Sequence, residues 1–150
     1  FIAKWPGVTK AKTMSEEQII IEDIFPTFLE MAKVNYKSEV DGKSFVKALR
    51  GENLDDNRLL VWHFPHFYDQ YPFSVARQGD FKVIYKYYDE SYELYNIKED
   101  LSEQNNLAEN NPEKLMELTS NLRNFLEEVN AQTPILKESN MPLAYPGLNK

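Results

Sequence analysis

"FSVARQGDFKVIYKYYDESYELYNI", residues 73–97, contains three short runs rich in aromatic and β-branched side chains. The runs span 73–79, 81–88 and 92–97, and they are separated by Gly-Asp and Asp-Glu-Ser turn segments. Such residues favour β-strands, and strands joined by short turns pair antiparallel. A fourth run of the same texture, "RLLVWHF" at 58–64, precedes them. The pattern predicts a four-stranded antiparallel meander.

Apolar and lysine side chains alternate along the run at 81–88, so one face of the sheet needs a cover. The segment 111–129 can supply it, because Asn111 is a suitable N-cap and Pro112 falls in the first helical turn. Its apolar stripe consists of Leu115, Leu118, Leu122, Phe125 and Val129. We therefore predict an α+β fold in which a long C-terminal helix lies across the sheet.

Two further helices are expected upstream. One runs from about Asp23, a plausible N-cap, to Ala32, with Pro26 in its first turn. Its apolar side would hold Ile24, Phe25, Phe28, Leu29 and Met31. A short helix at 44–51 begins at Ser44 and stops at Gly51.

The chain opens with "FIAKWPG", residues 1–7, whose apolar start and Pro-Gly end read as a strand followed by a turn. A strand needs neighbours, and the next fifty residues offer little strand pattern. We place a boundary near Asp41, with one strand and one helix of a larger body in 1–40 and a compact unit in 41–150. The tail, residues 132–150, carries three prolines and is expected to be an extended segment that wraps around the unit.

Composition removes several functional classes. The chain has 24 acidic and 17 basic residues and a net charge of −7, without a long basic run, so nucleic acid is not an expected partner. It has no cysteine, and no apolar run reaches the roughly 20 residues that cross a membrane. No P-loop, GxSxG or SxxK pattern occurs. We expect no membrane partner for this chain.

The two histidines, His63 and His66, stand in the aromatic stretch "LLVWHFPHF" at 59–67. Three alternatives remain open: a metal site, a structural role within an aromatic wall, and a role in a cleft, where a histidine contacts substrate or handles a proton. The first is disfavoured because positions i and i+3 of an extended chain point to opposite faces. The surrounding aromatics fit either a sugar-stacking surface or an ordinary sheet core.

In order along the chain, "FIAKWPG", "DIFPTFLEMA", "DGKSFVKALRGE", "LLVWHFPHF", "SVARQGDFKVIY" and "ELYNIKEDLSEQNNLAENNPE" resemble the closing part of a type I sulfatase. The resemblance is greatest to bacterial enzymes that desulfate polysaccharides and glycosaminoglycans. It implies that 1–40 end a large alkaline-phosphatase-like α/β domain, with its last strand and helix. It also implies that 41–150 form the antiparallel-sheet-plus-helix subdomain.

Sulfatases of this type use a formylglycine, made from Cys or Ser in a CxPxR or SxPxR motif, together with calcium. The chain has no cysteine, and none of its serines is followed by xPxR. The resemblance thus implies calcium and formylglycine in the parent enzyme but neither in this chain, which is expected to be inactive alone.

As part of a sulfatase, the chain would contribute a wall of the pocket for a sulfated saccharide or aryl sulfate. The resemblance makes His63 and His66 candidate substrate contacts, with Arg77 and Lys82 as candidates for an anionic sugar. The missing N-terminal sulfatase domain is the implied partner, and a periplasmic or secreted location is implied by the family. The alternative is a stand-alone glycan-binding or scaffolding module that reuses the subdomain.

Overall fold

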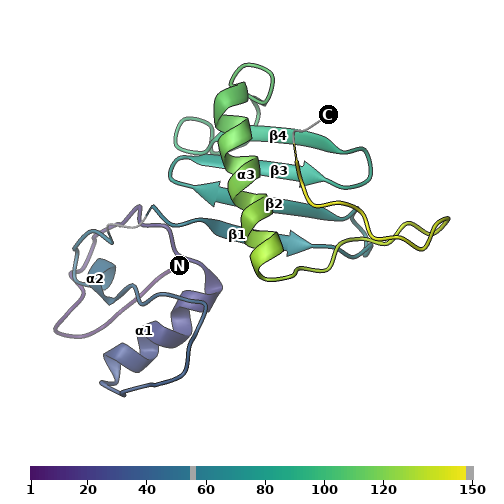
Figure 1. The fold of residues 1–150 in the computed structure, drawn as a ribbon. Helices are drawn as coiled ribbons and strands as arrows, with labels where there is room; N and C mark the ends of the chain where they lie inside the picture. Colours follow the sequence, from purple (N-terminus) through teal and green to yellow (C-terminus); the bar gives the residue numbers. More distant parts are fainter. Residues whose placement is uncertain (55–56, 148–150) are drawn as a thin grey trace. The chain divides into compact units, whose positions relative to one another are not determined.

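The computed structural model describes residues 1–54 and 57–147. The chain divides into two compact units, Phe1–Asp56 and Asn57–Lys150, called here the first and second units. Figure 1 shows the helices of the first unit and the sheet with its helix in the second. The predicted boundary near Asp41 concerns the domains of a longer protein, and it stays a prediction.

The second unit is built on a four-stranded antiparallel sheet in the order β1-β2-β3-β4. Its strands are β1 (Leu60–Phe64), β2 (Phe73–Gln78), β3 (Phe81–Lys86) and β4 (Ser91–Asn96). Gln78 pairs with Phe81, so only Gly79 and Asp80 connect β2 to β3. Gly79 has a φ of 57°, a conformation that glycine adopts without steric cost. The predicted meander is confirmed in every strand.

One helix, α3 (Pro112–Glu128), covers one face of this sheet, as Figure 1 shows. The Asn111 side chain accepts a hydrogen bond from the Lys114 N–H, so the predicted N-cap is confirmed. A shared core joins the two layers and consists of Ala76, Val83, Leu94, Leu115, Leu118, Leu122 and Leu126. The burial of this apolar surface holds the helix on the sheet.

The predicted stripe of α3 is wrong at its C-terminal end. Phe125 is 38% exposed and Val129 is 54% exposed, whereas Leu126 is fully buried. The predicted stripe repeats every seven residues, which corresponds to 3.5 residues per turn. An α-helix has 3.6 residues per turn, so the buried face shifts by one residue over about three turns. Leu126, eleven residues after Leu115, completes three turns and faces the sheet.

The first unit contains a single-turn 3-10 helix, η1 (Ile21–Asp23), followed by α1 (Ile24–Met31) and α2 (Val46–Leu49). Both predicted helices are confirmed, and Pro26 lies in the first turn of α1. Phe45 and Val46 are almost fully buried, and Gly51 ends α2 with a φ of 83°. This positive φ is the conformation in which glycine commonly stops a helix.

Buried hydrogen bonds tie α1 to the segment before α2. The Asp23 carboxylate accepts from the backbone N–H groups of Ile20 and Lys43, at 2.9 and 2.8 Å. The Thr27 hydroxyl donates to the Asp23 carbonyl at 2.6 Å and accepts from the Phe45 N–H at 3.0 Å. Asp23 and Thr27 are fully buried, so these bonds satisfy groups that would otherwise be costly to bury.

Asp23 occupies the predicted N-cap position of α1, but its side chain does not cap the helix, because its carboxylate accepts from the N–H groups of Ile20 and Lys43. Two other local predictions for the first unit are wrong. Phe25 and Phe28 are 49% and 57% exposed, so the expected apolar side of α1 is not buried within this unit. Residues 1–5 form no strand, because a strand needs a hydrogen-bonding neighbour and the described residues before 55 include no other strand.

Candidate functional site

The pairing register separates the predicted site residues onto two faces of the sheet. His63 pairs with Ser74, and Arg77 pairs with Lys82. Because side chains alternate between faces, His63 shares the α3 face with Ala76 and Val83, whereas Arg77 and Lys82 lie on the opposite face. The structure therefore does not bring the predicted residues together into one site.

His63 has a hydrogen-bond partner on each ring nitrogen. Its Nδ1 lies 2.7 Å from the Ser74 hydroxyl, and its Nε2 lies 2.6 Å from the backbone oxygen of Gln132. Since a carbonyl can only accept, Nε2 carries the proton, and in the neutral ring Nδ1 accepts from Ser74. The hydroxyl of Tyr87, 3.1 Å from Ser74 Oγ, then donates to that oxygen. The geometry favours the structural alternative for His63, and its contact with substrate stays a prediction.

Arg77 and Lys82 also have partners within the chain. Arg77 Nε lies 3.5 Å from the Gly79 carbonyl, at the outer limit of a hydrogen bond. The Lys82 ammonium forms a 2.7 Å ion pair with Glu103, and both side chains are partly exposed. On the same face Lys86 is paired with Glu93, whose hydrogen bond raises the pKa of Lys86. Of these three basic side chains, Lys82 and Lys86 are bonded to carboxylates, whereas Arg77 is bonded to a backbone carbonyl.

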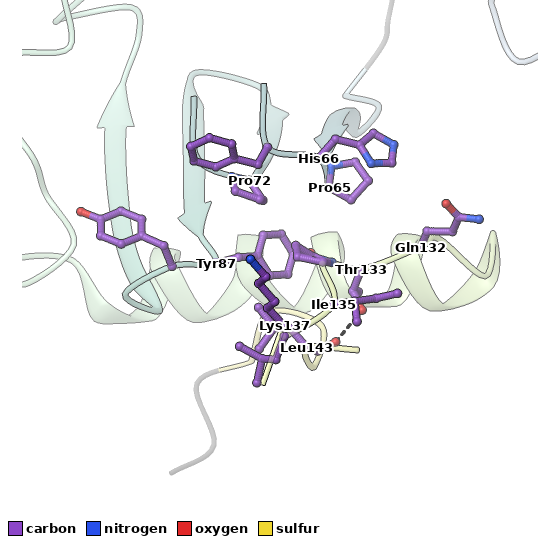
Figure 2. A pocket seen from close by; sticks show the side chains of 13 residues that line it. Pro65, His66, Pro72, Tyr87, Gln132, Thr133, Ile135, Lys137 and Leu143 are labelled. Carbon is purple, nitrogen blue, oxygen red and sulfur yellow. Dashed lines mark hydrogen bonds between the residues drawn. The ribbon is translucent and has the colours of Figure 1, made fainter. Parts of the chain in front are cut away.

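His66 lies in a different environment, at the wall of a pocket of about 490 Å³. We call this pocket the tail groove, because residues of the tail form one of its sides. Figure 2 shows Pro65 and His66, which follow β1, on one side and Ile135, Lys137 and Leu143 of the tail on the other. Tyr87 lies between the two sides in this view. The volume is within the range of small-molecule sites.

Hydrogen bonds within the tail fix its side of the groove. Leu143 N–H donates to the Pro134 carbonyl at 2.8 Å, and the Thr133 hydroxyl donates to the Leu143 carbonyl at 2.6 Å, the dashed line of Figure 2. The bond from His63 to the Gln132 carbonyl attaches the start of this loop to β1. Tyr145 donates to the Ala131 carbonyl at 2.7 Å. The expected extended tail is therefore a folded-back loop anchored to the sheet.

Aromatic side chains continue from the groove onto the surface. The rings of Tyr71 and Tyr88 are stacked with centroids 4.5 Å apart, and Phe67 packs edge-on against Tyr71 at 5.3 Å. All three are more than half exposed. Phe67 and Tyr88 also line the groove. The sequence left open whether the aromatic side chains form a sugar-stacking surface or a sheet core. These three are exposed enough to stack on a sugar, whereas Tyr85 and Tyr95 are buried in the core.

The raised pKa values of Tyr87 and Tyr88 keep the hydroxyls of these two residues protonated at neutral pH. Burial raises the pKa of Tyr87, against a smaller lowering by its hydrogen bond with Ser74. The hydrogen bond with the Asp89 carboxylate raises the pKa of Tyr88. The pKa of Asp89 is lowered, mainly by its hydrogen bond with the Ser91 side chain. These hydroxyls can therefore donate hydrogen bonds, but they are unsuited to act as bases at neutral pH.

Sequence reasoning missed the tail side of the groove. Lys137 stands in "PILKES", a segment with no periodic pattern, and nothing in its spacing relates it to His66. The three prolines of the tail indicated an irregular segment but not where it would fold back.

No group of three or more His, Asp or Glu residues suited to a metal ion occurs within 1–54 and 57–147. Over the same residues, the structure contains no helix with the length and apolar character of a membrane span.

The meander covered by one helix is the architecture of a sulfatase C-terminal subdomain, and comparisons with known proteins identify the same class. Residues 1–132 match the family described as N-sulphoglucosamine sulphohydrolase, C-terminal. The chain belongs to this sulfatase family.

Curated relatives agree with this assignment. A "Sulfatase" of Formosa agariphila is 36% identical, with 97% of this chain and 30% of the relative covered. An "N-acetylglucosamine-6-O-sulfatase" of Bacteroides thetaiotaomicron is 32% identical, over 71% of this chain and 20% of the relative. The chain therefore spans less than a third of the length of either protein.

A solved structure extends the comparison. It is described as BT4656 in complex with its substrate D-glucosamine-2-N,6-O-disulfate, and it superposes with a TM-score of 0.60 at 28% identity. The match covers 75% of this chain and 24% of that one. The predicted resemblance and the predicted α+β fold are thereby confirmed.

Proposed function

We propose that the chain is the C-terminal part of a sulfatase that hydrolyses the sulfate esters of a saccharide. The observation that carries the proposal is the 36% identity to a sulfatase over 97% of this chain. The solved relative described with D-glucosamine-2-N,6-O-disulfate supports a sulfated saccharide as the substrate class.

The catalytic groups of this sulfatase are expected outside the chain. Family members use formylglycine and calcium, and this chain has neither cysteine nor an SxPxR serine. The described residues also hold no cluster that fits a metal ion, so we assign no catalytic step to them. Their part is to form a wall of the substrate pocket, next to the N-terminal sulfatase domain that is the proposed partner. The exposed Phe25 and Phe28 of α1 are apolar surface that such a partner can cover.

Sulfate release from an aryl sulfate and from a sulfated oligosaccharide tests this proposal. The longest natural protein that carries the chain should release sulfate, and the 150-residue chain should give only the blank rate. Turnover by the chain alone would contradict the assignment of catalysis to another part. Absence of turnover by the longer protein on every sulfated substrate would overturn the proposed activity.

The proposed substrate contacts are tested one at a time in the longer protein. His66→Ala and Arg77→Ala are each expected to lower kcat/KM for the sulfated saccharide about tenfold, the loss of one charge-assisted hydrogen bond. Lys82→Ala should have a smaller effect, because Lys82 is already paired with Glu103. Unchanged kinetics in a variant would remove that residue from the site.

The alternative, a stand-alone glycan-binding or scaffolding module, has one observation in its favour, the exposed aromatic cluster of Phe67, Tyr71 and Tyr88. It is preferred only if the natural gene product begins near Phe1 and binds glycan without releasing sulfate. We further propose a periplasmic or secreted location from family membership. Cell fractionation with an antibody against the chain tests it, and a purely cytoplasmic signal would contradict it.

A further inference from the structure

We propose that the tail groove is a binding site for an anionic saccharide, in which Tyr88 stacks on a sugar ring and Lys137 pairs with a sulfate group. Only the class of ligand rests on the proposed function. The groove, its aromatic side chains and its cation are features of the second unit itself.

The charge of the groove differs from that of the chain. The chain has seven more acidic than basic residues, yet the groove contains Lys137 and His66 and no Asp or Glu among its lining residues. Within the described part of the chain, Lys137 forms no ion pair. An anionic group in the groove therefore meets a cation, and none of the residues that line the groove carries a carboxylate.

The aromatic side chains of the groove indicate that its ligand contains a sugar ring. An exposed ring next to a polar pocket matches a sugar, whose C–H face packs on an aromatic face while its hydroxyls bond to polar groups. Tyr88 lies between the groove, which it lines, and Tyr71, on which it stacks at 4.5 Å. Stacking on Tyr71 fixes the ring of Tyr88 in place, which reduces the entropy lost on binding.

The walls are held in place before any ligand arrives. On the tail side, the hydrogen bonds of Thr133 and Leu143 close the loop. On the sheet side, the bond of His63 to the Gln132 carbonyl attaches that loop to β1. His63 is thus a positioning residue for the groove, and Lys137 and Tyr88 are the residues that contact the ligand.

Binding of sulfated tetrasaccharides tests the proposal in the longest natural protein that carries the chain. Tetrasaccharides from heparin, ulvan and carrageenan serve as probes, each with its chemically desulfated form, and affinity is measured by calorimetry. At least one sulfated probe should bind. Lys137→Ala should weaken that probe about fivefold and leave its desulfated form unchanged, because the ammonium contacts only the anionic group.

Tyr88→Ala should weaken the sulfated and desulfated forms by the same factor, about fivefold, because stacking does not depend on the sulfate. Matched controls are Lys98→Ala, an exposed lysine of the β4 end, and Tyr68→Ala, which is 76% exposed and does not line the groove. Neither control should change affinity, and unchanged melting temperatures show that all variants are folded.

Failure of all sulfated probes to bind would overturn the inference, as would equal effects of Lys137→Ala on both forms of a probe. Sulfate release is recorded in parallel and reports on the proposed function alone. If the protein binds as predicted but releases no sulfate, the groove proposal stands and the proposed sulfatase activity is wrong. If it releases sulfate while the Lys137→Ala and Tyr88→Ala variants bind normally, the proposed activity stands and the groove proposal is wrong.

Discussion

The Nε2 atom of His63 lies 2.6 Å from the backbone oxygen of Gln132, 69 positions later in the chain. The same ring contacts Ser74 on the neighbouring strand, so one imidazole joins β1, β2 and the start of the tail. A residue with both nitrogens engaged in this way contributes to the architecture of the second unit, whatever else it does.

Replacement of His63 by Ala should lower the free energy of unfolding by about 2 kcal/mol, since two hydrogen bonds are lost and Gln132 loses its partner. The tail should also become more sensitive to protease. Thermal melting and limited proteolysis measure the two effects. His66→Ala is the control, because His66 is exposed, and its effect should stay within about 0.5 kcal/mol. Equal stability of the two variants would contradict the anchoring role.

Gly42 should not tolerate a side chain. A Cβ at this position would lie 2.0 Å from the backbone oxygen of Glu22, so the backbone must shift to admit it. We expect Gly42→Ala to destabilise the first unit by more than about 2 kcal/mol.

Gly147→Ala is the matched control for Gly42→Ala, because its Cβ would meet only the flexible end of Arg123 at 2.9 Å. Denaturant unfolding followed by circular dichroism compares the two. A Gly42→Ala protein as stable as the control would show that the approach to Glu22 is not tight.

Leu126→Ala should cost about 3 kcal/mol, whereas Phe125→Ala should cost less than about 1 kcal/mol, despite the larger side chain removed. The reason is that Leu126 is fully buried against the sheet and Phe125 is 38% exposed. Chemical denaturation of both variants provides the measurement. A larger loss of stability in Phe125→Ala than in Leu126→Ala would support the apolar stripe predicted from the sequence.

The second unit should lose stability above about pH 10. Burial raises the pKa values of Tyr85 and Tyr87 above their ordinary value of 10.0, so the folded state holds these protons more tightly than the unfolded chain does. This stability is fully present below pH 10 and is lost as the pH rises from 10 towards the folded pKa values.

Melting temperatures between pH 8 and pH 11 follow this loss. The double variant Tyr85→Phe, Tyr87→Phe should show a shallower decline than the natural chain, since neither position can ionise. Tyr68→Phe, at an exposed position, should not change the slope. Parallel pH curves for the double variant and the natural chain would contradict the assignment to these two tyrosines.

The sheet was predictable because its signals are local. Alternation along 81–88 and the Gly-Asp turn determine which residues pair, and both are visible within a few positions. The cap at Asn111 was equally local. The stripe of α3 failed at Phe125 because a small error in the helical period accumulates over about three turns.

The candidate site was less predictable, for a different physical reason. Whether His63 and Arg77 share a face depends on the register in which their two strands pair, and that register follows from the length of the connection between the strands. The groove depends on a contact between β1 and the tail that no local pattern indicates. The strand expected at residues 1–5 depends on pairing partners and not on composition alone.

Because every strand of the sheet pairs with its immediate neighbour in sequence, the order of synthesis can also be the order of assembly. Hairpins with short loops close within microseconds, and proteins dominated by local contacts fold fast. The exception is helix α3, since Pro112 is made only after all four strands have been synthesised. During that interval Ala76, Val83 and Leu94 face water on a nascent chain, which makes this the period when the polypeptide is most exposed to aggregation.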